Sequence, residues 1–375
     1  MRIAIDGRTI THQRTGVGKY AERTVDALLR LDSANEYILF LVEDSETLHA
    51  PNLQKILIPG FHRMVFNRWW ENVILPRFLV RRSIDIFFSP AYILPVIAKP
   101  TATKFVATIH DLIAYTYPES FTKKMRLWQR IFVQNAAKKA DLIIAVSEAT
   151  KLDLLRYSPA IAENIAVVHH AVEETFRPIS DTAFLERAHA KYGLPQRFIL
   201  TVGTIEPRKN HVLLAKAYSL LPEGIRNQYP LVFAGNLGWY SDRILAEISQ
   251  IGLGKNLLNL GFVDHEDLPA LYNLASLFVY PSLYEGFGYP PLEAMSCGTA
   301  VITSNRSSLP EVVGDAAILI DPNNVHQLAH EIERVLTDET ILREMREKSI
   351  QRAAQFSWKK NAEETLRVFE IALKV

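Results

Sequence analysis

The segment that most restricts the fold of this chain runs from residue 275 to residue 303, because it joins two apolar runs through a short connection containing glycines and prolines. The runs at 275–280 and 299–303 predict buried strands. Between them, glycines allow a tight turn and a Pro-Pro pair opens a short helix. A strand, a loop, a helix and a second strand form a right-handed crossover of a parallel sheet. Such sheets bind ligands at the carboxyl ends of their strands, so the loop predicts a ligand site.

Two carboxylates bracket this loop, Glu285 at its entry and Glu293 in the expected first turn of the helix. Free backbone N–H groups at a helix start favour anionic or hydroxyl-rich ligands. On spacing alone, an ordinary interpretation stands equally open, in which Glu293 complements the helix dipole and Glu285 is a solvated loop acid.

The length of 375 residues exceeds what one hydrophobic core usually fills and predicts two domains. A hydrophobic content of 48% with 22% charged residues is that of a globular protein and excludes a largely disordered chain. The net charge of +1 offers no argument for nucleic acid as a partner. A single cysteine, Cys297, excludes an intrachain disulfide and suits a reducing compartment. With no signal-peptide pattern and no long apolar run, we expect a cytoplasmic protein.

Near the N-terminus, a predicted strand at 2–6 is followed by Gly16-Val17-Gly18 and an amphipathic helix from about residue 17 to 31. The spacing differs from a dinucleotide fingerprint, in which the glycines follow the strand directly. The P-loop pattern fails as well, because Tyr20 stands where Ser or Thr would hold magnesium. Two interpretations remain: the glycines let backbone N–H groups approach a diphosphate, or they form a structural turn.

A further apolar run, residues 104–110, delivers His110 and Asp111 to the carboxyl edge of the predicted sheet. Chemistry collects at this edge in open parallel sheets, although a single histidine is often structural. We predict a functional role for His110, with Asp111 capping the next helix or orienting the imidazole.

The polar segment 172–178 reads as an interdomain linker. Beyond it, six apolar runs alternate with helical patterns and predict a second doubly wound α/β domain. We therefore expect an N-terminal domain at 1–175, a C-terminal domain at 176–355 and a last amphipathic helix at 356–375.

The first strand of the second domain ends at Gly203 and is followed by Arg208 and Lys209, just before a helix. Two fixed positive charges suit the phosphates of an activated sugar, whereas a surface basic pair is the ordinary alternative. The segment 264–267 is read as an exposed turn rather than a metal site, and the chain contains no Asp-x-Asp motif.

The stretch Glu285-Gly286-Phe287-Gly288-x-Pro-x-Leu-Glu293-Ala-Met resembles the donor-binding signature of retaining glycosyltransferase family 4. This resemblance implies the GT-B fold, with two Rossmann-like domains facing a central cleft and a last helix that crosses back to the N-terminal domain. It implies that Glu285 holds hydroxyls of the transferred sugar and that Glu293 holds the ribose.

The same resemblance assigns the remaining contacts to the donor. Arg208 and Lys209 would hold the diphosphate, backbone groups around Val263 the base, and His110 the sugar, while amides near Gly16, Val17, Gly18 and Phe287 would approach the diphosphate. Many family members carry arginine directly after the glycine. This chain has Thr204 there, so Arg208 must supply the guanidinium.

The resemblance implies a retaining, metal-independent hexosyltransferase without a cofactor, acting on a nucleotide sugar and a glycan or lipid-linked glycan acceptor of surface polysaccharide biosynthesis. GDP-mannose is the preferred donor, with rhamnosyl or glucosyl transfer from a dTDP- or UDP-sugar as the alternative. A nucleotide-sugar epimerase, a phosphorylase and a non-catalytic nucleotide-sugar binding protein stay open. Mixed basic and aromatic stretches at 61–82 and 123–130 raise two interpretations, peripheral contact with an anionic membrane or helices with a solvated basic face.

Overall fold

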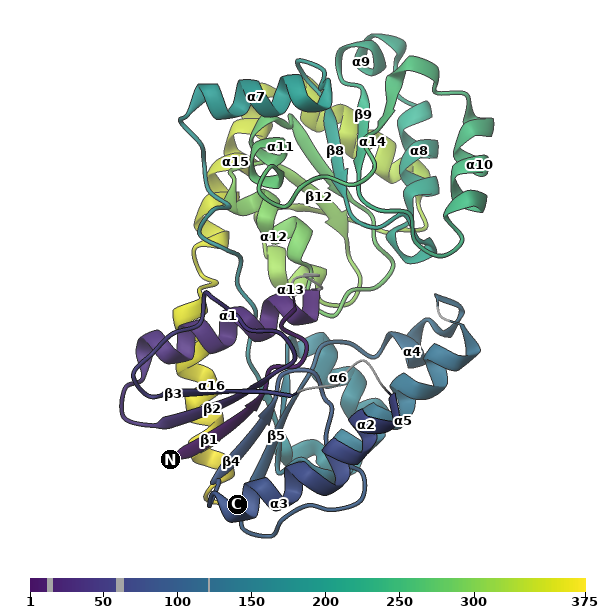
Figure 1. Ribbon diagram of the computed structural model, residues 1–375. Coiled ribbons are helices and arrows are strands. Elements are labelled where there is room, and N and C mark those ends of the chain that lie inside the picture. The colour runs from purple at the N-terminus through teal and green to yellow at the C-terminus, as the bar shows by residue number, and fades with distance from the viewer. Residues whose placement is uncertain (12–15, 59–63, 121) are drawn as a thin grey trace. The chain divides into compact units, whose positions relative to one another are not determined.

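The computed structural model describes residues 1–11, 16–58, 64–120 and 122–375 (Figure 1). The chain forms two compact units. The N-terminal unit comprises Met1–His170 and Ser357–Val375, and the C-terminal unit comprises Ala171–Phe356. The chain therefore passes between the units twice, after His170 and after Phe356.

The N-terminal unit contains a seven-stranded sheet in the order β3-β2-β1-β4-β5-β6-β7, with parallel pairing throughout. Its strands are β1 (Arg2–Asp6), β2 (Glu36–Leu41), β3 (Leu53–Leu57), β4 (Ile86–Ser89), β5 (Lys104–Ile109), β6 (Leu142–Ala145) and β7 (Ile165–Val167). Its helices are α1 (Gly16–Leu31), α2 (Met64–Trp69), α3 (Leu75–Arg81), α4 (Ile113–Thr116), α5 (Lys123–Lys139), α6 (Glu148–Tyr157) and α16 (Trp358–Ala372), with a π-helical turn at Trp70–Ile74 and 3₁₀ turns at Pro118–Ser120 and Pro159–Asn164.

The two faces of this sheet carry separate cores, because successive side chains of a strand point to opposite faces. Ile3 and Ile5 of β1 pack into a core shared with α1 and α16, whereas Ala4 packs into a core shared with α3, α5 and α6. The near-continuous apolar sequences of these strands follow from burial on both faces.

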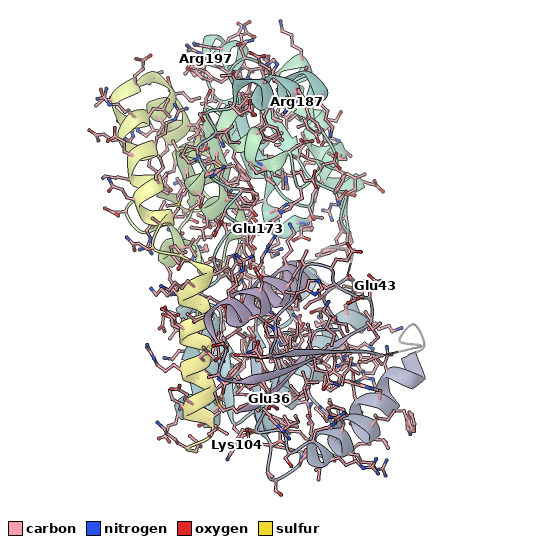
Figure 2. The ribbon with its side chains drawn as sticks, turned by 60° about the vertical axis from the view of Figure 1, so that its left-hand side comes forward. Glu36, Glu43, Lys104, Glu173, Arg187 and Arg197 are labelled. Atoms are coloured by element: carbon pink, nitrogen blue, oxygen red, sulfur yellow. The ribbon has the colours of Figure 1, made fainter. Side chains whose placement is uncertain are left out.

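The last helix, α16, packs beside α1 in the N-terminal unit (Figures 1 and 2). Ser357 caps it by accepting from the Lys360 N–H at 3.2 Å. Asn361 then donates to the His169 carbonyl at 2.8 Å. The predicted return of the C-terminal helix to the N-terminal unit is confirmed.

The C-terminal unit contains a six-stranded parallel sheet in the order β10-β9-β8-β11-β12-β13. Its strands are β8 (Ile199–Val202), β9 (Leu231–Ala234), β10 (Leu257–Asn259), β11 (Leu277–Tyr280), β12 (Val301–Ser304) and β13 (Ile318–Ile320). Its helices are α7 (Thr182–Tyr192), α8 (His211–Ser219), α9 (Glu223–Gln228), α10 (Ser241–Ile251), α11 (Leu268–Leu274), α12 (Tyr289–Ser296), α13 (Leu309–Val313), α14 (Val325–Thr337) and α15 (Glu339–Ala353), with 3₁₀ turns at Pro207–Lys209 and Gly254–Asn256.

Both predicted doubly wound domains are thus present. Strand β3 was not predicted, because its sequence Leu-Gln-Lys-Ile-Leu alternates little and is only partly buried. Within the described residues, no helix is both long enough and apolar enough to cross a bilayer.

Candidate functional site

The charged residues predicted for the diphosphate meet at the carboxyl edge of the C-terminal sheet. Arg208 and Lys209 lie in the 3₁₀ turn that follows β8, and Glu285 lies in the loop that follows the adjacent strand β11. The two loops are tied by the Leu283 N–H, which donates to the Arg208 carbonyl at 2.9 Å. Parallel neighbours end at the same sheet edge, and this brings residues 76 positions apart into contact.

Arg208 and Lys209 hold the two oxygens of the Glu285 carboxylate separately. Arg208 Nη1 lies 2.6 Å from Oε2, and Lys209 Nζ lies 2.7 Å from Oε1. Arg208 Nη2 also pairs with Glu206 at 2.5 Å. All four side chains are largely buried, so these charge-assisted hydrogen bonds act in a low dielectric.

These contacts determine which groups are charged. Burial alone would raise the pKa of Glu285, but the charges of Arg208 and Lys209 outweigh it and lower this pKa to about 2. Burial also acts to lower the pKa of Arg208, and here Glu285 and Glu206 outweigh it and raise the pKa. The site therefore presents a carboxylate and a guanidinium at every physiological pH.

Hydroxyl groups fix the position of the Glu285 loop. Tyr280 and Ser282 donate to Oε1 at 2.8 and 2.7 Å, and Lys209 also donates to the Tyr280 hydroxyl. The Glu285 N–H donates to Oγ of Ser307, a residue held at a φ of 49°. Such a left-handed conformation is costly for serine and is typical of functional loops.

Three glycines lie at the same sheet edge as this cluster. A Cβ on Gly203 would lie 3.7 Å from Lys209 Cε and 3.8 Å from the Tyr280 ring, and a Cβ on Gly235 would lie 2.1 Å from the Gly203 carbonyl oxygen. Gly203, Gly235 and Gly261 follow three adjacent strands and are linked by backbone bonds, from Gly203 N to Ala234 O and from Gly235 N to Gly261 O. A side chain at position 235 would therefore clash with the backbone after β8, so glycine there lets the two loops pack closely at this edge.

Glu293 lies in the second turn of α12, which corrects the expectation of the first turn. The helix begins at Tyr289, since Gly288 serves as its N-cap at a φ of 117°. Pro290 and Pro291 have no N–H, so the helix start offers fewer backbone donors than expected. Glu293 Oε2 accepts from the buried Tyr272 hydroxyl at 2.8 Å, which holds the carboxylate in place instead.

Three further residues predicted to contact the donor, Phe287, Gly286 and Val263, lie in the loops that follow β11 and β10. Phe287 is buried, stacks edge-to-face on Phe356, and its carbonyl accepts from Ser308 at 2.6 Å. Gly286 is adjacent. Val263 is buried in the segment after β10.

The predicted residues of the N-terminal unit surround Tyr20. His110 follows β5, is buried, and its Nε2 lies 2.7 Å from the Pro90 carbonyl, which requires the proton on Nε2. Burial lowers the pKa of His110, so the imidazole is neutral. Tyr20 packs edge-on against His110 with ring centroids 4.8 Å apart and stacks on His170 at 4.4 Å.

Gly16, Val17 and Gly18 form the first residues of α1, and Gly18 is buried. A Cβ on Gly16 would meet no described atom within 4 Å, and its φ is not positive. Neither packing against the described residues nor backbone strain therefore requires glycine at position 16.

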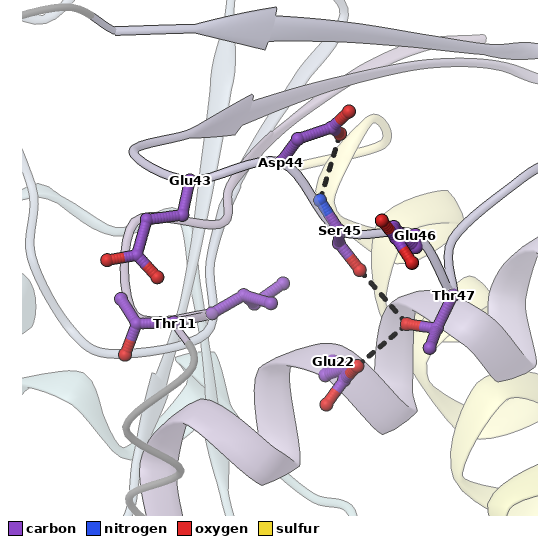
Figure 3. A pocket seen from close by; sticks show the side chains of 8 residues that line it. Thr11, Glu22, Glu43, Asp44, Ser45, Glu46 and Thr47 are labelled. Carbon is purple, nitrogen blue, oxygen red and sulfur yellow. Dashed lines mark hydrogen bonds between the residues drawn. The ribbon is translucent and has the colours of Figure 1, made fainter.

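An acidic hollow of about 300 Å³ lies elsewhere in the N-terminal unit (Figure 3). Most of its lining side chains carry carboxylates or hydroxyls, and they come from α1, from the segment after β1 and from the segment after β2. The lining residues are Ile10, Thr11, Glu22, Glu43, Asp44, Ser45, Glu46 and Thr47. Thr47 bridges Glu22 and Ser45 there. Among the described residues, no group of three or more His, Cys, Asp or Glu side chains is arranged to hold a metal ion. The side chains of the segment 264–267 have other partners. His265 lies 3.0 Å from Glu173, which Figure 2 labels, and Lys191 forms ion pairs with Asp264 and Asp267.

Sequence reasoning missed Glu206, Tyr280 and Ser282 as parts of the site. Each lies in a stretch that was singled out, Glu206 two residues before Arg208, and the other two at the end of β11. A buried cation needs a carboxylate partner, which was the available signal for Glu206.

Two family models match the chain, "Glycosyltransferase Family 4" over residues 14–176 and "Glycosyl transferases group 1" over residues 185–356. The "O-antigen chain mannosyltransferase B" of Escherichia coli is 33% identical over 387 residues, covering 99% of this chain and 100% of that protein. The "Serotype-specific mannosyltransferase WbdA" of Escherichia coli is 37% identical over 279 residues, which cover 73% of this chain but only 34% of WbdA.

Among solved structures, Anabaena Alr3699/HepE in complex with UDP and glucose matches with a TM-score of 0.75 at 18% identity, covering 99% of this chain and 100% of that one. This likeness extends to the fold alone. Together with the matched models and relatives, it shows that the chain belongs to glycosyltransferase family 4, with the GT-B fold and a sequence similar to bacterial mannosyltransferases.

Proposed function

We propose that this chain is a retaining glycosyltransferase that moves mannose from GDP-mannose to a hydroxyl of a glycan or lipid-linked glycan acceptor in O-antigen biosynthesis. The choice of a mannosyl donor is supported by the similarity of this chain to the O-antigen chain mannosyltransferase B along that protein's whole length.

The observation that carries the proposal is the cluster of Arg208, Lys209 and Glu285 at a glycine-lined sheet edge. Cleavage of the anomeric C–O bond leaves negative charge on the diphosphate, and cations already aimed at that charge stabilise the transition state. Arg208 Nη2 carries two N–H donors, and its described partner is Glu206. Lys209 has three N–H donors, and its described partners are Tyr280 and Glu285. Both cations thus retain donor capacity for a phosphate.

In the proposed reaction, the acceptor oxygen bonds to the anomeric carbon on the face from which the diphosphate leaves. The C–O bond to the diphosphate breaks, and the departing phosphate oxygen takes the acceptor's proton. Glu285 accepts from hydroxyls of the sugar, His110 contacts the sugar, and Glu293 accepts from the ribose. Amides near Gly16, Gly18 and Phe287 add donors to the diphosphate.

Neutralisation of the diphosphate is assigned to Arg208 and Lys209, so the proposed reaction needs no metal ion. Activity of the EDTA-treated protein in metal-free buffer checks this directly. Turnover that vanishes with EDTA and returns with a divalent cation would contradict the assignment.

The test of the function is a reaction of GDP-mannose with a mannose-containing acceptor, followed by NMR of the product. We expect the anomeric configuration of the donor to be kept, and an inverted product would refute the retaining mechanism. Parallel thermal-shift measurements with GDP-, UDP- and dTDP-sugars identify the donor, since a ligand of the native state raises its melting temperature. A new sugar species formed without acceptor would favour an epimerase or a phosphorylase.

We further propose peripheral contact with an anionic membrane through α5, whose first turns expose Met125 and Leu127 next to Lys123 and Lys124. Residues 61–63 of the other basic and aromatic stretch, at 61–82, lie outside the described residues. Absence of sedimentation with anionic liposomes at low salt would remove this part of the proposal.

A further inference from the structure

A pocket of about 560 Å³ opens in the N-terminal unit between α5 and the segment after β4. Aromatic rings form much of its wall, and its lining residues are Tyr92, Lys124, Met125, Trp128, Gln129 and Phe132. Trp128 and Phe132 are stacked with an interplanar angle of 27°, and the Arg68 guanidinium lies about 5 Å over both rings, at 5.0 and 4.9 Å. These contacts fix the indole, which stays 40% exposed.

Both walls of the pocket are connected to His110. Tyr92 lies two residues after Pro90, whose carbonyl accepts from His110 Nε2 at 2.7 Å. From the other wall, Gln129 Nε2 donates to Oδ1 of Asp111, the residue after His110, at 3.0 Å. Burial and the charge of Asp111 raise the pKa of Tyr92, which places the phenol in the field of the same carboxylate. The pocket therefore adjoins the residue assigned to the transferred sugar.

Among the described residues that line the pocket, one buried side-chain polar atom has no hydrogen-bond partner. Because a carboxylate only accepts, Gln129 must direct its amide nitrogen to Asp111, and its Oε1 is then buried with no hydrogen bond from any described residue. A buried acceptor without a donor is costly, and a hydroxyl from a ligand would satisfy it. A hydrocarbon chain has no donor and would leave Oε1 unpaired.

Backbone strain occurs at the same place. Tyr92 has a φ of 50°, a conformation that is rare for a bulky residue and that occurs where function demands a particular side-chain position.

From these observations we infer that this pocket binds a sugar ring of the acceptor glycan, with the ring's C–H face on Trp128 and one hydroxyl donating to Gln129 Oε1. A pyranose combines an apolar face with hydroxyl donors, which matches a flat exposed indole beside an unpaired amide oxygen. Lys124 at the wall offers N–H donors to ring or hydroxyl oxygens. The inference rests on the proposed transfer to a glycan and assigns its acceptor subsite.

The test compares wild type with Trp128→Ala, Trp128→Phe and Gln129→Leu, using methyl α-mannopyranoside as the acceptor probe. Saturation-transfer NMR with this probe reports acceptor binding without turnover. We expect its signal to be lost in Trp128→Ala and Gln129→Leu and largely kept in Trp128→Phe. In turnover assays, the acceptor KM should rise about tenfold or more, the effect of losing one good contact, while kcat changes little.

Matched controls come from the same unit. Gln134→Leu changes an exposed glutamine of α5 and Leu152→Ala removes an exposed apolar side chain of α6, both outside the pocket. Neither should alter probe binding. Melting temperatures of all variants identify any that misfold. In that case Trp128→Leu and Gln129→Lys, which removes the acceptor oxygen but keeps an N–H donor toward Asp111, replace the pair, and the sugar signal should be lost in both.

The outcomes separate this inference from the proposed function. GDP binding that persists while the sugar signal is equal in wild type, Trp128→Ala and Gln129→Leu would overturn the subsite and leave glycosyl transfer intact. Absence of both GDP binding and GDP-mannose turnover in wild type would overturn the proposed function itself. A decyl phosphate probe that binds wild type and displaces the sugar would replace the sugar with a lipid chain and overturn the inference.

Discussion

Each unit carries a buried arginine just beyond its first strand, and the two arginines are held in the same way. Arg8 follows β1 and pairs with Asp6, two residues earlier, and with Glu71. Arg208 follows β8 and pairs with Glu206, also two residues earlier, and with Glu285. In each set one acid lies two residues before the arginine, with Asp6 ending β1 and Glu206 directly preceding the 3₁₀ turn, and the other acid comes from a segment distant in the sequence.

The two clusters differ in how many N–H groups of the arginine remain able to donate to a ligand. Arg8 uses Nε and Nη2 on Asp6 and Nη1 on Glu71, stacks on Trp70 at 4.8 Å, and its side chain is 3% exposed. Arg208 has a 15% exposed side chain, a second cation beside it, and two N–H donors on Nη2, whose described partner is Glu206. The Arg8 cluster has its N–H donors paired within the fold, whereas we propose that the Arg208 cluster takes up an anion.

The largest effect on stability should come from breaking the cluster of Arg8, Asp6 and Glu71. Arg8→Ala leaves Asp6 buried without its cation and leaves Glu71 with only the longer 3.5 Å pair to Arg68, which we expect to lower the free energy of unfolding by about 3–5 kcal/mol. Chemical denaturation measures this. The triple variant Arg8→Met, Asp6→Asn, Glu71→Gln removes the charges together and should recover part of the loss; no recovery would mean that Arg8 acts otherwise than by pairing these acids.

The cluster of Arg208, Lys209, Glu206 and Glu285, here called the open cluster, should instead affect catalysis. Arg208→Ala or Lys209→Ala removes one contact to developing charge, so we expect turnover to fall by about ten- to a thousandfold. Initial rates with GDP-mannose measure this loss, and circular dichroism of each variant controls for folding. Near-wild-type rates in both variants would discredit the diphosphate assignment.

A histidine beside the open cluster makes stability depend on pH. Burial, and then the charge of Lys209, lower the pKa of His211 to about 4, below the ordinary value of 6.5. The folded state disfavours protonation of His211. Its contribution to the free energy of unfolding is therefore complete above pH 6.5 and decreases as the pH falls toward 4. The total decrease is roughly 3 kcal/mol at most. Denaturation of wild type and His211→Phe between pH 7 and pH 4 tests this. Parallel pH profiles for the two proteins would rule it out.

The smallest effect concerns Glu293. Glu293→Ala should weaken the binding of GDP by about tenfold, the loss of one charged hydrogen bond to the ribose. Calorimetry with free GDP measures the affinity. Glu293→Gln still accepts from Tyr272 and serves as the control for the position of α12. Equal GDP affinity in wild type and Glu293→Ala would exclude the ribose role.

Sequence patterns predicted most strands of both sheets, because strands buried on both faces are runs of apolar residues. They also placed Arg208, Lys209 and Glu285 at one sheet edge, since parallel neighbours end together. They did not predict the pairing of Arg8, because nothing in Asp6-Gly7-Arg8 distinguishes a buried ion pair from a solvated turn and Glu71 lies 63 residues away. The start of α12 was missed for a local reason, as the φ of Gly288 lets the helix begin before its prolines.

The most direct test of the account is a comparison of GDP with GMP, which differ by the phosphate that the open cluster is proposed to hold. Calorimetric affinities are measured for wild type, Arg208→Ala and Lys209→Ala. We predict that wild type binds GDP more tightly than GMP and that this preference shrinks by at least about tenfold in each variant. An unchanged preference in the variants would contradict the claim that Arg208 and Lys209 bind the diphosphate.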